Sequence, residues 1–209
     1  MSDVCKRRPT DIVIDIETAP ADEEAIELYN KYFAAVNKTK RKTARPGLHP
    51  CVTKIIVVGI KPLKKKPIVF AEDPGSGVGE KEVLEETKKC LEDLGAGRYI
   101  TYNGTAFDFP MLRIRAAVWR IDGLGRLLPA AHSARNCDLY RMIKWDMPLS
   151  LSEMALVMTG APKCVSGDEI AELYKNGQIE KIIEHNISDL ELTEMLYLHK
   201  NDLFGTSVN

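Results

Sequence analysis

β-Branched residues alternate with polar positions in several short runs of the first half of the chain. In DIVIDIE, at 11–17, isoleucine recurs at every second position, which is the period of a β-strand with two different faces. Later runs such as KIIVVGIK are almost continuously apolar, as in an internal strand. The predicted strands are 11–17, 54–61, 67–72 and 98–103, of which the second and third form a hairpin.

Apolar residues recur every three or four positions in other segments, as on the buried side of amphipathic helices. The predicted helices are 21–36, 79–95, 107–120, 137–145, 150–159, 166–175 and 178–200, so the chain after about residue 106 is mostly helical. The Pro- and Gly-containing stretch 38–53 is predicted to be a loop. Because the chain has neither repeats nor a linker, we expect one α/β domain over 1–209, with a mixed sheet flanked by helices.

Composition and cysteine usage limit the class of protein. The chain has 209 residues, 44% of them hydrophobic and 28% charged, with a net charge of −1, which is typical of one globular domain with a sizeable core. Its five cysteines are scattered without a C-x-x-C pair, so neither a disulfide framework nor a thiolate metal site is indicated. No signal peptide or bilayer-spanning run is visible, and we expect a cytoplasmic protein that does not associate with membranes.

Basic residues are concentrated in two stretches. Residues 38–54 hold six Lys or Arg and no acid, and 61–67 adds four lysines. Such stretches can follow a phosphate backbone, although short lysine runs are also common in solvated loops and hairpin tips. Lys40, Arg41 and Lys42 are the candidate substrate-binding residues of the first stretch.

Asp15 and Glu17 lie two positions apart in the first predicted strand. This spacing places both carboxylates on one face, about 7 Å apart, while the isoleucines face the other way. Two acids in an apolar strand are costly unless a cation or strong donors compensate their charge. Mg²⁺ or Mn²⁺ would do so, because both prefer oxygen ligands. The alternative is a strand that ends in a solvent-facing turn.

Asp108 follows the predicted junction between the strand 98–103 and the next helix. Taken alone, it is a first-turn acid favoured by the helix dipole. Phe107 and Phe109 flank it, and an aromatic ring beside a metal-binding acid can stack on the bases of a single strand. Core packing is the alternative for both rings, and it is favoured more for Phe109.

His185 and Asp189 are four residues apart on the last predicted long helix, so they share one of its faces. A histidine here can orient or deprotonate an attacking water while Asp189 holds a metal ion. The alternative is an ordinary surface pair on a helix.

The three segments together resemble the DEDD 3′–5′ exonucleases. The pattern consists of D-x-E on a first strand, N-x-x-x-F-D at a strand-to-helix junction, and H-x-x-x-D near the carboxyl end. The resemblance is closest to stand-alone predicted exonucleases similar to the proofreading domain of family B DNA polymerases. It covers nearly the whole chain, including DLYRMIKW between the second and third motifs. It implies a ribonuclease H-like fold, with a five-stranded mixed sheet and helices on both faces.

The resemblance also implies roles for individual residues. Asp15 would bridge two Mg²⁺ or Mn²⁺ ions, Glu17 and Asp189 would complete the site of the attacking water, and Asp108 would hold the second ion. Thr18 and Asn103 would support substrate binding; their alternatives are a turn hydrogen bond and a strand-end cap. The substrate would be single-stranded nucleic acid with a free 3′ end, DNA favoured, releasing 5′-mononucleotides. A proofreading role would need a polymerase partner, and repair is equally open.

His185 departs from the family pattern. The subclass with this spacing usually has tyrosine here, whereas the histidine subclass places its two residues one position further apart. Since one residue rotates a helical side chain by about 100°, His185 is expected to occupy the tyrosine's place, near the attacking water. Two alternatives remain open: a binding module of the same fold that cleaves poorly, and a metal-dependent nucleotide phosphohydrolase, which needs no basic loop.

Overall fold

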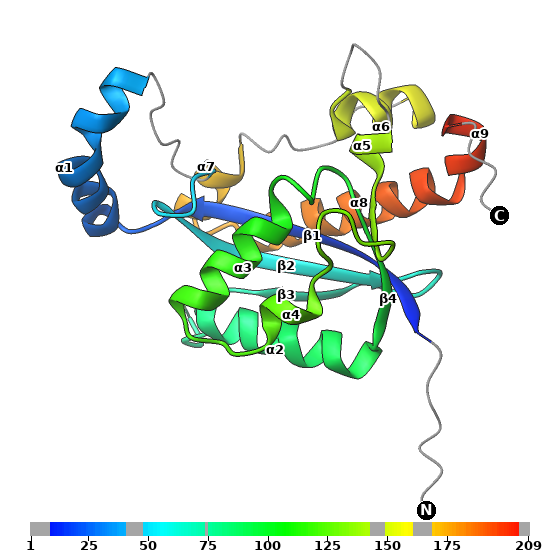
Figure 1. Ribbon diagram of the computed structural model, residues 1–209, viewed down its shortest axis with the longest axis horizontal. Coiled ribbons are helices and arrows are strands. Elements are labelled where there is room, and N and C mark those ends of the chain that lie inside the picture. Colours follow the sequence, from blue (N-terminus) through cyan, green and yellow to red (C-terminus); the bar gives the residue numbers. More distant parts are fainter. Residues whose placement is uncertain (1–8, 41–47, 74, 143–148, 161–168, 205–209) are drawn as a thin grey trace, which may run out of the picture.

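The chain folds around one five-stranded mixed sheet in the computed structural model, which describes residues 9–40, 48–73, 75–142, 149–160 and 169–204, without the side chains of 32–40 and 204. The strands are β1 (Thr10–Pro20), β2 (Thr53–Pro62), β3 (Ile68–Ala71), β4 (Ala96–Thr101) and β5 (Asn136–Asp138). Their order is β3-β2-β1-β4-β5. β1 and β2 are antiparallel, as are β2 and β3, whereas β4 is parallel to both β1 and β5. β1 is therefore the central strand (Figure 1).

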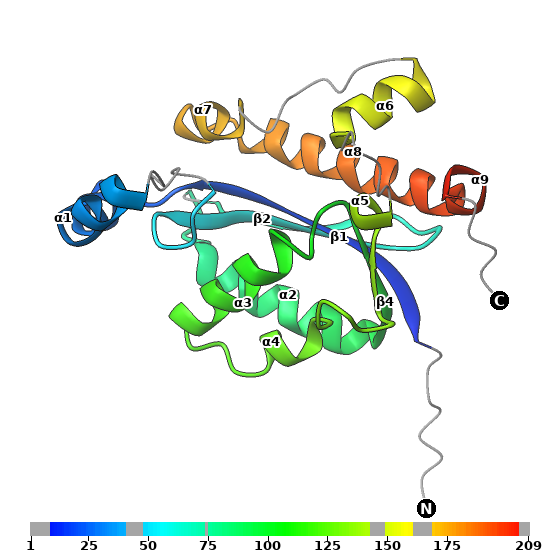
Figure 2. The same ribbon diagram turned by 45° about the horizontal axis from the view of Figure 1, so that its top comes forward.

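Helices cover both faces of this sheet. The helices are α1 (Glu23–Lys40), α2 (Glu80–Leu94), α3 (Asp108–Val118), α4 (Leu124–Leu127), α5 (Leu139–Met142), α6 (Leu151–Thr159), α7 (Ile170–Lys175), α8 (Ile179–Leu198) and α9 (Lys200–Phe204). α2, α3 and α4 lie on one face of the sheet, and α5, α6, α7 and α8 lie on the other (Figure 2). Apolar side chains of each group form core clusters with the strands. The long helix α8 runs along β1 and β2, so any polar residue on its inner side faces the centre of the sheet.

The sequence predictions are largely confirmed. All four predicted strands form, the hairpin is present, and the expected five-stranded mixed sheet is observed. Three local predictions are wrong. The predicted loop 38–53 begins too early because α1 continues to Lys40, the predicted helix 137–145 begins as strand β5, and α4 was not predicted. β5 has only three residues and forms by pairing with β4, a tertiary contact that its own pattern does not encode.

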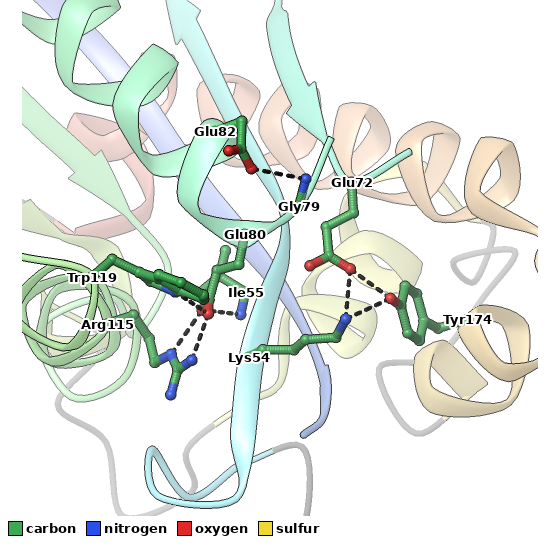
Figure 3. A network of polar contacts seen from close by, with 9 residues as sticks. All are labelled: Lys54, Ile55, Glu72, Gly79, Glu80, Glu82, Arg115, Trp119 and Tyr174. Atoms are coloured by element: carbon green, nitrogen blue, oxygen red, sulfur yellow. Dashed lines mark hydrogen bonds and ion pairs between the residues drawn. The ribbon is translucent and has the colours of Figure 1, made fainter. Parts of the chain in front are cut away.

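A buried carboxylate joins α2, α3 and β2. Glu80 accepts hydrogen bonds from Nε of Arg115 (2.8 Å), from Nε1 of Trp119 (2.6 Å) and from the backbone N–H of Ile55 (2.8 Å) (Figure 3). Its charge is paired with a guanidinium and its oxygens are hydrogen-bonded, as a buried acid requires. This cluster fixes α3, which begins at Asp108, against the sheet.

A second polar cluster holds α7 against the hairpin. The Lys54 ammonium donates to Glu72 (2.8 Å) and to the Tyr174 hydroxyl (2.7 Å), and that hydroxyl donates to Glu72 (Figure 3). α7 immediately precedes α8 along the chain, so the cluster helps to fix where α8 begins. No helix within the described ranges is both long and apolar enough to cross a membrane.

Candidate metal centre

β1 presents its two acids to α8 and its isoleucines to the opposite face. Ile14 and Ile16 belong to the core cluster formed with α2 and α3, whereas Asp15 and Glu17 contact residues of α8. The alternation predicted from the sequence is therefore observed. The register between β1 and β2 shifts between Glu17 and Thr18, and such β-bulges re-aim side chains beside functional sites.

α8 brings His185 and Asp189 to Glu17. Nε2 of His185 lies 3.6 Å from Oε1 of Glu17 and 3.6 Å from Oδ2 of Asp189. All three residues are buried, and one potential ligand atom from each lies within 4.8 Å of the other two. The surface helical pair that was the alternative for His185 and Asp189 is thus ruled out. This group, which we call the ligand triad, combines two carboxylates with one imidazole.

Asn186 connects Asp15 to the same helix. Its Nδ2 donates to Oδ2 of Asp15 (2.8 Å), and its side chain is fully buried. Gly59, the register partner of Asp15 on β2, makes this approach possible: a Cβ there would lie 1.9 Å from Oδ1 of Asn186. The sequence analysis missed both residues. The available signals were a glycine in a continuously apolar strand and an asparagine between His185 and Asp189.

Asp108 is buried at the first position of α3 and points back to β1. Its Oδ1 accepts a hydrogen bond from the backbone N–H of Ile16 (3.1 Å), the residue between the two acids of β1. Burial raises the pKa of Asp108 to about 7, and the negative charges of Asp138 and Asp189 act in the same direction. Asp108 is outside the ligand triad, but it is electrostatically part of the same acidic site.

Asp138, a buried acid that the sequence analysis did not select, orders the segment leading to Asp108. It ends β5, and its two oxygens accept hydrogen bonds from the backbone N–H groups of Asn103 (2.8 Å) and Thr105 (3.0 Å). Asn103 has a positive φ of 69°, so this turn adopts a left-handed conformation that the carboxylate stabilises. The signal was DLYRMIKW, where an acid precedes an apolar helical pattern.

The other predicted site residues have different surroundings. Thr18 is half-buried inside β1, so it does not lie in a turn, and Asn103 lies in the turn after β4. Phe107 is half-buried against the core cluster, and the Phe109 ring packs edge-on against Tyr99, the core role that was favoured for it. Arg41, Lys42 and the side chain of Lys40 lie outside the described residues, so their assignment stays a prediction.

The fold is an α/β fold of the ribonuclease H-like class, as expected. It matches part of a family B DNA polymerase from the hyperthermophilic archaeon Pyrobaculum calidifontis, with a TM-score of 0.63 and 17% sequence identity. The match covers 95% of this chain and 25% of the polymerase, so the chain spans about a quarter of that protein's length. At this identity, the likeness establishes a shared fold. No protein-family model and no curated protein matches the chain.

Proposed function

We propose that this protein is a metal-dependent 3′–5′ exonuclease that releases 5′-mononucleotides from single-stranded nucleic acid, DNA favoured. The observation that carries the proposal is the convergence of acids from three distant segments. Glu17 and Asp189 meet around His185, Asp108 is bonded to the backbone between the two acids of β1, and Asp15 is held from α8. A fold shared with part of a DNA polymerase supports a nucleic-acid substrate for such a site.

The donor set fits divalent cations that prefer oxygen. Burial, and to a smaller extent the charges of Asp138 and Asp189, raise the pKa of Asp108, and a cation beside it would favour its ionised form. Glu17 and Asp189 would hold one ion, Asp108 a second, and Asp15 would serve both. Both Mg²⁺ and Mn²⁺ accept carboxylate oxygens of this kind as ligands. When bound, such ions acidify a water molecule and neutralise developing charge on phosphodiester oxygens.

The residues of the chain have separable roles in this proposal. His185 lies 3.6 Å from both Glu17 and Asp189, where it can accept a proton from a water held by those carboxylates. Asn186 donates to Oδ2 of Asp15 and so helps to orient that carboxylate toward the proposed metal site. Asp138 acts indirectly by ordering the turn that leads to Asp108.

Cleavage of a 5′-labelled 20-nucleotide strand, as DNA and as RNA, tests the proposal with Mn²⁺, Mg²⁺ or chelator. We expect a metal-dependent ladder that shortens from the 3′ end. Asp15→Asn should lower the rate at least about 100-fold, and His185→Ala by roughly 10²- to 10⁴-fold. Asp122→Asn, the same change at an exposed loop acid, is the matched control and should retain full activity.

Other results would contradict the proposal in recognisable ways. Full activity of purified Asp15→Asn would exclude its role at the metal. Metal-dependent binding without cleavage would indicate the weak binding module, and hydrolysis of free nucleotides but not of strands would indicate a nucleotide phosphohydrolase.

A further inference from the structure

A cluster of cations lies at the end of the sheet where β1 begins. The β2–β3 turn exposes Lys64, Lys65 and Lys66, while Arg98 of β4 and Lys200 of α9 lie beside the same end. We call these five residues the basic edge. Figure 2 shows the β2–β3 turn next to the carboxyl-terminal part of α8 and to the start of β1.

Contacts with β1 and α8 hold the β2–β3 turn in place. The buried Lys61 ammonium lies 2.6 Å from Oε2 of Glu194 on α8 and donates to the carbonyl oxygen of Lys65 (2.7 Å). The other Glu194 oxygen accepts the backbone N–H of Lys64 (2.5 Å), and the N–H of Leu63 donates to the Asp11 carbonyl (3.1 Å). Lys61 pairs with Glu194, and these contacts fix the backbone of the turn that carries the three exposed lysines.

Lys64 occupies a backbone position that is unfavourable for lysine. It is the second central residue of the turn closed by the hydrogen bond from Lys65 N–H to the Pro62 carbonyl (3.0 Å), and its φ is 61°. Glycine or asparagine is usual there, because a Cβ is strained at positive φ. The side chain is exposed, so packing does not explain why a lysine is present. Among the described residues, no carboxylate forms an ion pair with the ammonium groups of Lys64, Lys65 or Lys66.

Tyr197 connects the other two cations of the basic edge. Nη1 of Arg98 is 3.4 Å from the Tyr197 hydroxyl, and the Lys200 ammonium lies 3.9 Å from the centre of its ring. Asp11 offsets Arg98 only in part, at 3.9 Å. Cations therefore lie on both sides of the start of β1, in the β2–β3 turn and beside the end of α8, with Asp11 between them.

We propose that the basic edge is a second nucleic-acid contact, which binds the phosphate backbone of a single strand. It is separate from the metal centre, because Asp15, the nearer acid of that centre on β1, is four residues beyond Asp11, or roughly 13 Å. Binding of a polyanion by the basic edge does not depend on the proposed function. The further claim, that the basic edge holds the part of a substrate remote from the 3′ end, rests on the proposed function.

Fluorescence anisotropy with a 20-nucleotide oligothymidylate in chelator tests this proposal without metal or cleavage. The variant carries Lys64→Gly, Lys65→Gln and Lys66→Gln. We expect its dissociation constant at about 100 mM salt to rise about 10- to 100-fold, and the salt slope to fall by about 2, at about 0.7 per lost phosphate contact. The control carries Lys81→Gln, Lys88→Gln and Lys89→Gln on α2, the same change in charge at lysines outside the basic edge, and should bind like wild type.

Thermal unfolding shows whether weaker oligonucleotide binding by a variant arises from a loss of stability. Because glycine relieves the positive φ while retaining the N–H of residue 64, Lys64→Gly alone should melt no lower than wild type yet bind more weakly. Equal oligonucleotide binding by wild type and the triple variant would overturn the proposal. So would lysine-dependent binding of phosphatidylserine vesicles without binding of the oligonucleotide. Failure of the exonuclease assay alone would leave this binding result unaffected.

Discussion

The charge of Asp108 depends on its burial more than on any single neighbour. Its pKa is raised from 3.8 to about 7, first by desolvation and then by the carboxylates of Asp138 and Asp189, while hydrogen bonding to the N–H of Ile16 opposes the shift. A cation at the centre would reverse this balance, since it favours the ionised form. The ionisation of Asp108 thus indicates whether a cation compensates the negative charge of the acidic site.

The raised pKa of Asp108 makes the free energy of unfolding depend on pH in a definite direction. Between pH 3.8 and about 7, folded Asp108 keeps a proton that the unfolded chain has released. Its contribution to the free energy of unfolding is therefore present at low pH and is lost as pH rises through about 7. In chelator, we expect Asp108→Asn to gain stability relative to wild type as pH rises across that window. Urea unfolding of both proteins from pH 4 to 8 measures it. A difference that is constant with pH would contradict the assignment.

At the scale of residues, the sequence identified the acids but not the groups that hold them. Asp15, Glu17 and Asp189 were recognisable because charged residues interrupt apolar patterns. Asn186 was not, because its bond to Asp15 spans 171 positions, and Asp138 supports a turn 33 to 35 positions away. Such partners are defined only once the elements are packed together.

Among the elements, the contact of α8 with β2 decides whether the centre can assemble. Gly59 has no side chain where Asn186 and Leu190 approach; an added Cβ would lie 1.9 Å from Oδ1 of Asn186 and 2.6 Å from Cδ1 of Leu190. Helix and sheet can be this close only because the position is glycine.

Gly59→Ala should therefore displace α8 and damage the metal centre. We expect a stability loss of about 1–3 kcal/mol, as for overpacking in a core, together with weaker Mn²⁺ binding, because His185 and Asp189 move with α8. Urea unfolding and Mn²⁺ titration measure the two effects. Gly125→Ala is the control, since its nearest atom would lie at an ordinary 3.6 Å. Wild-type Mn²⁺ affinity in Gly59→Ala would show that this close approach is not needed.

The sequence predicted elements correctly where the apolar repeat extends over many residues. It failed where an element forms only by pairing with another strand. α2 and α8 carry repeated apolar positions over 15 and 20 residues, and both were predicted. β5 has three residues, and its extended conformation depends on β4. The end of α1 was missed because a basic stretch followed by Pro and Gly resembles a loop.

For the whole molecule, topology explains how distant acids meet. β1 is central and its acids face α8, while parallel β4 and β5 end near each other, where Asp138 orders the turn toward Asp108. A net charge of −1 conceals two opposite regions, the acidic centre and the basic edge. Negative charge thus lies where cations would bind, and positive charge lies where phosphates would bind.

Mn²⁺ binding to the purified protein, followed by electron paramagnetic resonance at pH 7.5, tests the central claim most directly. We predict two ions per chain for wild type and at most one for Asp108→Asn, while Asp15→Asn weakens both sites. The exposed control Asp122→Asn should bind two. Absence of Mn²⁺ binding by wild type, or equal binding by wild type and Asp15→Asn, would contradict a metal centre at these carboxylates.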